Sequence, residues 1–171
     1  MAIPHSFQRR AALFGLAGLA ALLTGCGFEL RRAPELHFKT IYLGGFREHS
    51  PQADELRRSI AASTTTRVVD APLQAEVILE AIDDSRDKGV VASTAAGQVR
   101  EMQLSKRLNF KLFTRGGKPL IAPTEIVLTR DMTYNERDAL AKESEEELLY
   151  RAMDADIAAQ VLRRLAAIQS L

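Results

Sequence analysis

The strongest constraint on the fold is a long alternation of apolar and polar residues between Gln98 and Thr114. Successive side chains of a β-strand point to opposite faces, so this pattern predicts one long strand with a buried face and an exposed face. Only Lys106 interrupts the apolar face. The apolar face carries Met102, Leu104, Leu108, Phe110 and Leu112, and the polar face carries Gln103, Ser105, Arg107, Asn109 and Lys111.

A hairpin is predicted after this strand. Arg115–Lys118 contains two adjacent glycines, which suit a tight reversal of the chain, and the alternation resumes beyond it. The second arm places Ile126, Leu128, Met132 and Tyr134 on its apolar positions. These two arms predict an antiparallel pair at the centre of the fold.

The segments before the hairpin predict a crossover unit. Lys39–Leu43 is a β-branched and aromatic strand that ends at Gly44-Gly45. Ser50-Pro51 then starts a helix that runs to Ser63, with Ala53, Leu56 and Ile60 at helical spacing. Arg67–Val69 is a short extended piece. Ala75–Arg86 is apolar on both faces, as expected of a central strand, and Asp83-Asp84 is expected at its end.

The chain closes with a predicted helix from Lys142 to Ile168. Its apolar stripe recurs mainly every fourth residue, so one face should be buried. The stripe consists of Leu149, Met153, Ile157, Val161, Leu165 and Ile168. We expect the acidic run Glu143–Glu147 to lie at the helix N-terminus, where the helix dipole favours negative charge.

The element order β-α-β-β-β-α predicts the α+β class: a two-layer sandwich with two helices packed on one face of a small mixed β-sheet. The other sheet face should be polar and exposed. We expect a single domain over residues 39–171, preceded by a tether over residues 26–38.

The N-terminus has the features of a secretory signal peptide. Arg9 and Arg10 precede the apolar run Ala11–Leu23, which is too short to span a bilayer, since that takes about 20 apolar residues. Leu23-Thr24-Gly25-Cys26 resembles the lipobox of bacterial lipoproteins. We therefore expect cleavage after residue 25 and a covalent lipid on Cys26. Gly27 stands where many inner-membrane lipoproteins have Asp, which favours the periplasmic side of the outer membrane.

Composition excludes several classes of function. The chain carries 23 basic and 22 acidic residues, and removing the two leader arginines leaves a formal charge of −1, which does not suggest nucleic acid as a partner. No metal-ligand spacing, nucleophile elbow or phosphate loop is present, and Asp83 and Asp84 should point to opposite faces of a strand. The sequence predicts no catalytic residues, no metal site and no cofactor other than the lipid on Cys26.

Several blocks, taken in order, resemble the LPS-assembly lipoprotein (LptE) family. The likeness covers nearly all of the mature chain. The matching blocks are Cys26–Arg31, Gly97-Gln98, Arg130–Tyr134, Leu140–Glu143, Glu147–Met153, Gln160 and Arg164-Leu165.

This resemblance implies a domain that plugs the lumen of the outer-membrane β-barrel LptD, assists assembly of that barrel and binds lipopolysaccharide. Lys142 matches the family's lysine in Leu-Ala-Lys-Glu and is the first candidate for a phosphate contact. Ser93–Ala96 departs from the family at a position where some members carry a basic residue, so Lys88 and Arg100 are weaker candidates. Two alternatives remain open: a generic outer-membrane lipoprotein adapter for another periplasmic complex, and a hydrolase with an unrecognised site.

Overall fold

A computed structural model describes residues 35–62 and 65–170. The predicted signal peptide, Cys26 and most of the predicted tether lie outside this range. The tether was predicted to extend to residue 38, but Leu36 and Phe38 are buried in the main core. The packed domain therefore begins before Lys39, because these two side chains cover apolar surface that the first strand would otherwise leave open.

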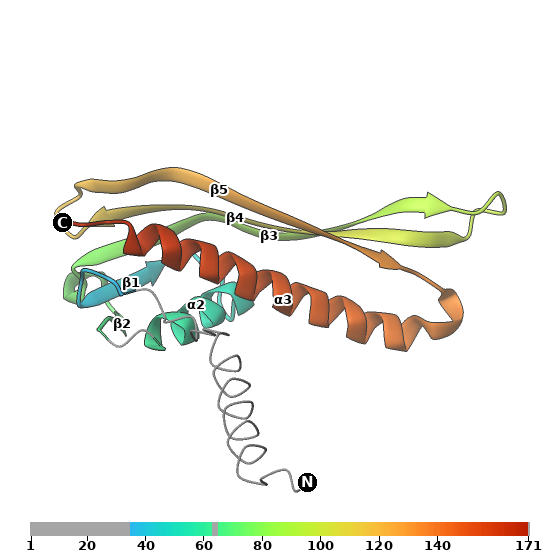
Figure 1. The fold of residues 1–171 in the computed structure, drawn as a ribbon, viewed down its shortest axis with the longest axis horizontal. Coiled ribbons are helices and arrows are strands. Elements are labelled where there is room, and N and C mark those ends of the chain that lie inside the picture. Colours follow the sequence, from blue (N-terminus) through green and yellow to red (C-terminus); the bar gives the residue numbers. More distant parts are fainter. Residues whose placement is uncertain (1–34, 63–64, 171) are drawn as a thin grey trace, which may run out of the picture. The chain divides into compact units, whose positions relative to one another are not determined.

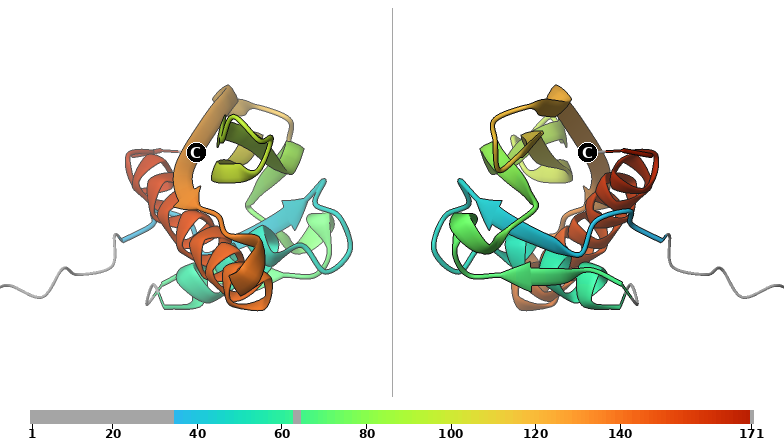
Figure 2. Two further views of the ribbon diagram at one scale, coloured as in Figure 1. Left: turned by 90° about the vertical axis from the view of Figure 1, so that its right-hand side faces the viewer. Right: turned by 90° about the vertical axis from the view of Figure 1, so that its left-hand side faces the viewer.

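Over the described residues, the domain is a five-stranded mixed sheet with the two α-helices Pro51–Ala61 and Ala139–Ala166 on one face (Figures 1 and 2). The strands are β1 (Thr40–Gly44), β2 (Arg67–Val69), β3 (Val77–Ser93), β4 (Val99–Thr114) and β5 (Pro119–Thr133), and their order across the sheet is β2-β1-β3-β4-β5. Strand β1 is parallel to both β2 and β3, and the β3–β4 and β4–β5 pairs are antiparallel. The predicted α+β two-layer class is confirmed. Arg67–Val69, expected only as a short extended piece, is the edge strand β2.

The first crossover forms as predicted. Strand β1 (Thr40–Gly44) leads to helix α2 (Pro51–Ala61), and the Ser50 side chain caps α2 by accepting a hydrogen bond from the Ala53 amide at 3.2 Å. Gly45 ends the pairing of β1 with β3. Its φ is +77°, and a Cβ atom there would lie 2.2 Å from the Ala81 carbonyl oxygen, so only glycine fits.

Strands β3 (Val77–Ser93), β4 (Val99–Thr114) and β5 (Pro119–Thr133) form two consecutive hairpins. Strand β3 continues well past the predicted end at Arg86, with a register irregularity between Ala81 and Asp83. Asp83-Asp84 therefore lies inside a strand and not at its end. The two turns use Gly97 (φ +78°) and Gly117 (φ +87°). Between β2 and β3 the chain makes a short 3-10 turn, η2 (Pro72–Gln74).

Helix α3 (Ala139–Ala166) follows a second 3-10 turn, η3 (Glu136–Asp138). Because α3 begins at Ala139, the acidic run Glu143–Glu147 lies beyond the first turn, and the predicted placement at the helix N-terminus is wrong. Three of its four carboxylates instead form ion pairs: Glu145 with Lys142, Glu146 with Lys88, and Glu147 with Arg86.

Two apolar clusters lie between the sheet and the helices. The larger one includes the α3 stripe residues Ile157, Val161 and Leu165 and the β4 residues Leu108, Phe110 and Leu112, as the alternation predicted. The smaller one consists of Leu104, Tyr150 and Met153, with Leu128 and Leu149 packed against it. Lys106 lies between Leu104 and Leu108 on the same face of β4, and its side chain is 2% exposed. A buried charge therefore sits between the two apolar clusters along this face of the strand.

Candidate functional site

The candidate site is the end of the domain where β3 turns into β4, here called the distal end. It comprises the turn Thr94–Gln98, the end of β5, the turn η3 and the first turns of α3 (Figure 1). All three sequence candidates for phosphate contact lie in or beside this region: Lys88 on β3, Arg100 on β4 and Lys142 on α3. The fold thus groups residues that are separated by up to 54 positions in the chain.

Lys142 is held within the protein. Its ammonium donates to the Thr133 hydroxyl at 3.1 Å and lies 2.8 Å from the Glu145 carboxylate, and its side chain is only 17% exposed. Thr133 is the last residue of β5, so Lys142 joins the end of that strand to the first turn of α3. Its charge is already paired with a carboxylate.

Lys88 is also paired. Its ammonium lies 2.8 Å from Glu146 on α3, and this hydrogen bond raises the pKa of Lys88 above its ordinary value. On the same side of β3, Arg86 donates to Asp154 at 2.6 Å and its guanidinium lies 4.6 Å above the Tyr150 ring. Ion pairs from Arg86 and Lys88 therefore connect the helix-facing side of β3 to α3.

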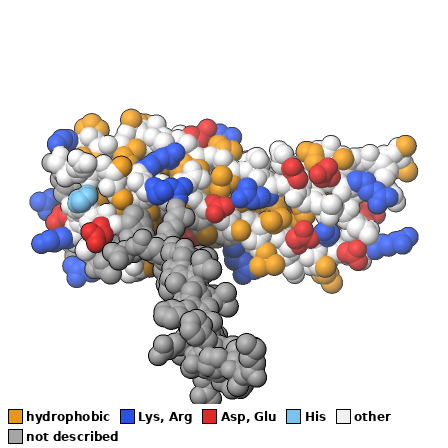
Figure 3. All heavy atoms as spheres, in the orientation of Figure 1, with side chains coloured by type: hydrophobic (Ala, Val, Ile, Leu, Met, Phe, Trp, Pro, Cys, Tyr) orange, Lys and Arg blue, Asp and Glu red, His pale blue; other side chains and the backbone are white. Residues whose placement is uncertain are grey.

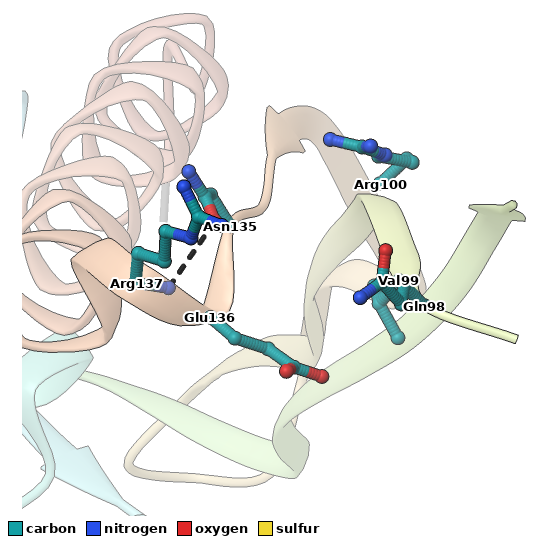
Figure 4. Close-up of a pocket in the computed structure, with 6 residues that line it drawn as sticks. All are labelled: Gln98, Val99, Arg100, Asn135, Glu136 and Arg137. Atoms are coloured by element: carbon teal, nitrogen blue, oxygen red, sulfur yellow. Dashed lines mark hydrogen bonds between the residues drawn. The ribbon is translucent and has the colours of Figure 1, made fainter. Parts of the chain in front are cut away.

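Arg100 is different, because its side chain is exposed and lines a cavity of about 260 Å³. One wall of this cavity is Gln98, Val99 and Arg100, and the other is Asn135, Glu136 and Arg137 (Figure 4). The Tyr134 amide donates to the Arg100 carbonyl at 2.8 Å, which fixes the two walls relative to each other. Arg100 and Arg137 therefore line one polar cavity from separate segments of the chain.

Arg137 was missed at the level of sequence. It lies in η3, which Asn135 initiates by accepting a hydrogen bond from the Arg137 amide at 3.2 Å (Figure 4). An Asn three residues ahead of an Asp, just after a strand, is a signal for such a turn. That signal could have placed Arg137 in a turn, but not opposite Arg100.

The described part of the chain offers no group of three or more His, Cys, Asp or Glu side chains that could hold a metal ion. Among the same residues, neither helix has the length and apolar content that crossing a bilayer requires. On the face seen in Figure 3, basic and acidic side chains are interspersed rather than gathered by sign. The lining of the distal cavity is polar and includes two arginines and one glutamate.

Solved lipoprotein structures share this arrangement. The solution structure of the uncharacterized lipoprotein B from Nitrosomonas europaea is 31% identical, with a TM-score of 0.70, over 82% of this chain and 91% of that one. The rare lipoprotein B from Shewanella oneidensis is 26% identical, with a TM-score of 0.63, over 75% of this chain and 95% of that one. The fold is thus one that other bacterial lipoproteins of known structure share.

Sequence comparison narrows the class to one family. The family model LptE, lipopolysaccharide-assembly, matches residues 38–165, and the chain belongs to this family. The LPS-assembly lipoprotein LptE of Photorhabdus laumondii is 28% identical over 166 residues, or 95% of this chain and 90% of the relative. That of Yersinia enterocolitica is 29% identical over 95% of this chain and 79% of the relative. The predicted family is confirmed.

Proposed function

We propose that this chain is a non-catalytic outer-membrane lipoprotein, anchored through Cys26, that plugs the LptD barrel, assists its assembly and binds lipopolysaccharide during export. Membership of the lipopolysaccharide-assembly family supports the general role. The observation that supports binding is the distal cavity, whose lining includes Arg100 and Arg137. Lipopolysaccharide carries phosphate groups, and arginine pairs well with phosphate oxygens.

The open face of the sheet supports the plug role. A barrel lumen is polar, so a plug should present a polar surface with its charges balanced. On this face Lys111 pairs with Glu80 at 3.1 Å, Arg107 pairs with Glu125, and Gln103 donates to Asp131 at 2.9 Å. These cross-strand pairs make the face polar and nearly neutral, as a wide polar lumen requires.

The predicted lipid on Cys26 supports a location at the outer membrane. With two or three acyl chains on Cys26, each buried methylene would contribute about 0.8 kcal/mol, enough for stable attachment where a single chain is marginal. We expect Cys26→Ala to leave a folded domain that fractionates away from membranes when LptD is absent. Membrane sedimentation of that variant without LptD would contradict the anchor.

The plug role is tested by site-specific photo-crosslinking in outer membranes. A crosslinker at Lys111 or Val127, both on the open face, should capture LptD, and detergent extraction should co-purify the same barrel. Depletion of the chain should leave LptD misassembled and the cell surface poor in lipopolysaccharide. If no surface position captures LptD and a soluble periplasmic protein co-purifies instead, the adapter function is correct.

A further inference from the structure

We infer that the outer edge of strand β5 pairs with the unpaired edge strand of a transmembrane β-barrel that has not yet closed. This inference rests on the proposed role in barrel assembly. The contacts are made by the backbone of Thr124–Thr133 and not by the charged pairs of the open face. An incomplete barrel exposes a row of unsatisfied amide and carbonyl groups at each edge, and such groups pair readily with another strand.

Strand β5 is the longer of the two edges of the sheet. Over the described residues, the strand order places β2 at one edge and β5 at the other. Strand β2 has 3 residues, whereas β5 has 15. Two prolines, Pro119 and Pro123, lie near the start of β5 and cannot donate to a new strand. From Thr124 to Thr133 the strand contains no proline and its register with β4 is regular, so this ten-residue stretch is open to pairing.

The register identifies which backbone groups lie on the outer edge. The Tyr134 amide donates to the Arg100 carbonyl at 2.8 Å, and the register of β5 with β4 is then constant as far as Thr124. Successive residues of a strand direct their amide and carbonyl groups to opposite sides, so even-numbered residues of this stretch bond to β4 and odd-numbered residues point outward. The outward-pointing residues, all exposed, are Glu125, Val127, Thr129, Asp131 and Thr133.

The position of Arg130 agrees with the outward direction of Thr129. The Arg130 guanidinium donates to the Thr129 carbonyl at 3.0 Å and to Asp156 on α3 at 2.9 Å. This side chain thus covers one acceptor in the middle of the free edge. Charged side chains at an edge reduce unwanted strand pairing. Arg130 therefore protects the edge until a partner strand displaces it.

The length and the pattern of this stretch match those of a barrel strand. A transmembrane strand takes about 9–11 residues, with polar side chains toward the lumen alternating with apolar ones toward the lipid. On β5 the outward-pointing residues are mostly polar, whereas Ile126, Leu128 and Met132 on the helix side are apolar, with Arg130 as the exception. A barrel strand added here would therefore continue the polar face with polar side chains and the apolar face with apolar ones. Closure would end the contact, because the first and last strands of the barrel then pair with each other.

The experiment measures closure of the LptD barrel in cells that produce the full-length lipoprotein as wild type or as a variant. Pulse-chase labelling follows the conversion of LptD to its folded, heat-modifiable form. Thr129→Pro removes an outward amide and should slow closure about tenfold, which corresponds to the loss of about one net hydrogen bond. Thr129→Ala keeps the amide and is the matched control, with which LptD should close at the wild-type rate. Because the Thr129 amide points away from β4, both variants should unfold at nearly the wild-type temperature.

Arg130→Ala tests the edge in the opposite direction. It uncovers the Thr129 carbonyl, so a photo-crosslinker at Asp131 should capture unclosed LptD more often in this variant than in the wild type. Asp156→Asn breaks the same ion pair with α3 but leaves Arg130 over the carbonyl, and it should leave capture unchanged. This measurement decides the inference even if Thr129→Pro does not fold.

The outcomes separate the edge from the function beneath it. If Thr129→Pro folds and LptD closes at the wild-type rate, the β5 edge is not used although the plug role stands. If detergent-extracted Arg130→Ala forms dimers that an added Thr129→Pro change abolishes, with LptD closure unaffected, the edge pairs with a second copy of the chain and the inference is wrong. If LptD never co-purifies with the wild-type lipoprotein, the proposed function itself fails.

Discussion

Lys106 on β4 donates a hydrogen bond to Asp84 on β3, and both side chains are less than a tenth exposed. The Lys106 ammonium also lies 3.5 Å from Asp154 on α3, and Asp154 in turn accepts a hydrogen bond from Arg86 at 2.6 Å. Two cations and two anions thus form a neutral cluster between the sheet and the helix. Ser50, the cap of α2, donates to Asp84 at 2.6 Å, so the cluster contacts both helices.

Replacing Lys106 with methionine should destabilise the domain by about 3–5 kcal/mol, because it leaves the buried Asp84 carboxylate without its counterion. The double variant Lys106→Met/Asp84→Leu should recover a substantial part of that loss, since apolar side chains often replace a buried pair with little cost. Urea denaturation of the two variants and the wild type measures both changes. A double variant less stable than Lys106→Met alone would show that Asp84 stabilises the fold independently of Lys106.

Gly45 is expected to be far less replaceable than the turn glycines. Gly45→Ala combines a positive φ with a Cβ atom 2.2 Å from the Ala81 carbonyl oxygen, so β1 must move away from β3. Gly97 has nearly the same φ, +78°, but nothing within 4 Å of an added Cβ. Gly97→Ala should therefore cost only about 1–2 kcal/mol for the left-handed conformation, and Gly45→Ala should cost clearly more. Equal midpoints of thermal unfolding for the two variants would contradict this account.

Ionisation of Tyr150 should lower the stability of the domain at alkaline pH. Burial raises the pKa of its phenol above the ordinary value of about 10, and its hydroxyl donates to the Asp87 carbonyl at 2.8 Å. The unfolded chain then loses this proton at a lower pH than the folded domain. The stabilisation is therefore complete below about pH 10 and declines as the pH rises toward the folded pKa.

This is measured by following phenolate absorbance in the wild type and in Tyr150→Phe. The absorbance that the variant lacks should titrate above the pH of a free tyrosine. The wild type should also lose more stability than the variant between neutral pH and the alkaline range. A Tyr150 signal at the pH of a free tyrosine would show that its ring is solvated.

The apolar stripe of α3 is tested by a matched pair of truncations. Ile157→Ala removes a fully buried side chain from the larger cluster and should cost about 2–5 kcal/mol. Leu148→Ala changes a side chain on the same helix that is 59% exposed, and it should alter stability by less than about 0.5 kcal/mol. Chemical denaturation of both variants makes the comparison.

The parts of the fold that periodicity controls could be predicted. The alternation on β4 and the stripe on α3 placed Phe110 and Ile157 in the core, because each pattern reports one face of one element. The distal half of β3 could not be predicted. Its helix-facing residues Asp84, Arg86 and Lys88 are charged, so the strand shows no apolar alternation, and it forms because β4 and the carboxylates of α3 lie beside it.

The candidate site, like the fold, could be predicted only in part. Sequence likeness directed attention to Lys142, and one residue type at one matching position says nothing of a neighbouring carboxylate. Lys142 pairs with Glu145, and Arg137 lines the same cavity as Arg100. Both relationships depend on how η3 and α3 pack beside β4. A buried charge was indicated in the sequence by Lys106, because this lysine interrupts the apolar face of the predicted strand. Its partner Asp154 is 48 residues away on another element.

The apolar stripe of α3 repeats every fourth residue, so sliding the helix by one turn, about 5.4 Å, would again place apolar side chains over apolar strands. Apolar packing therefore discriminates poorly between neighbouring axial positions of α3. The charged cluster discriminates well, because a slip of four residues would present Tyr150 or Ala158 to the Lys106 ammonium in place of Asp154. The contact between Lys106 and Asp154 therefore selects one axial position of α3. Because the η3 turn leads directly into α3, the same contact also selects the position of that turn.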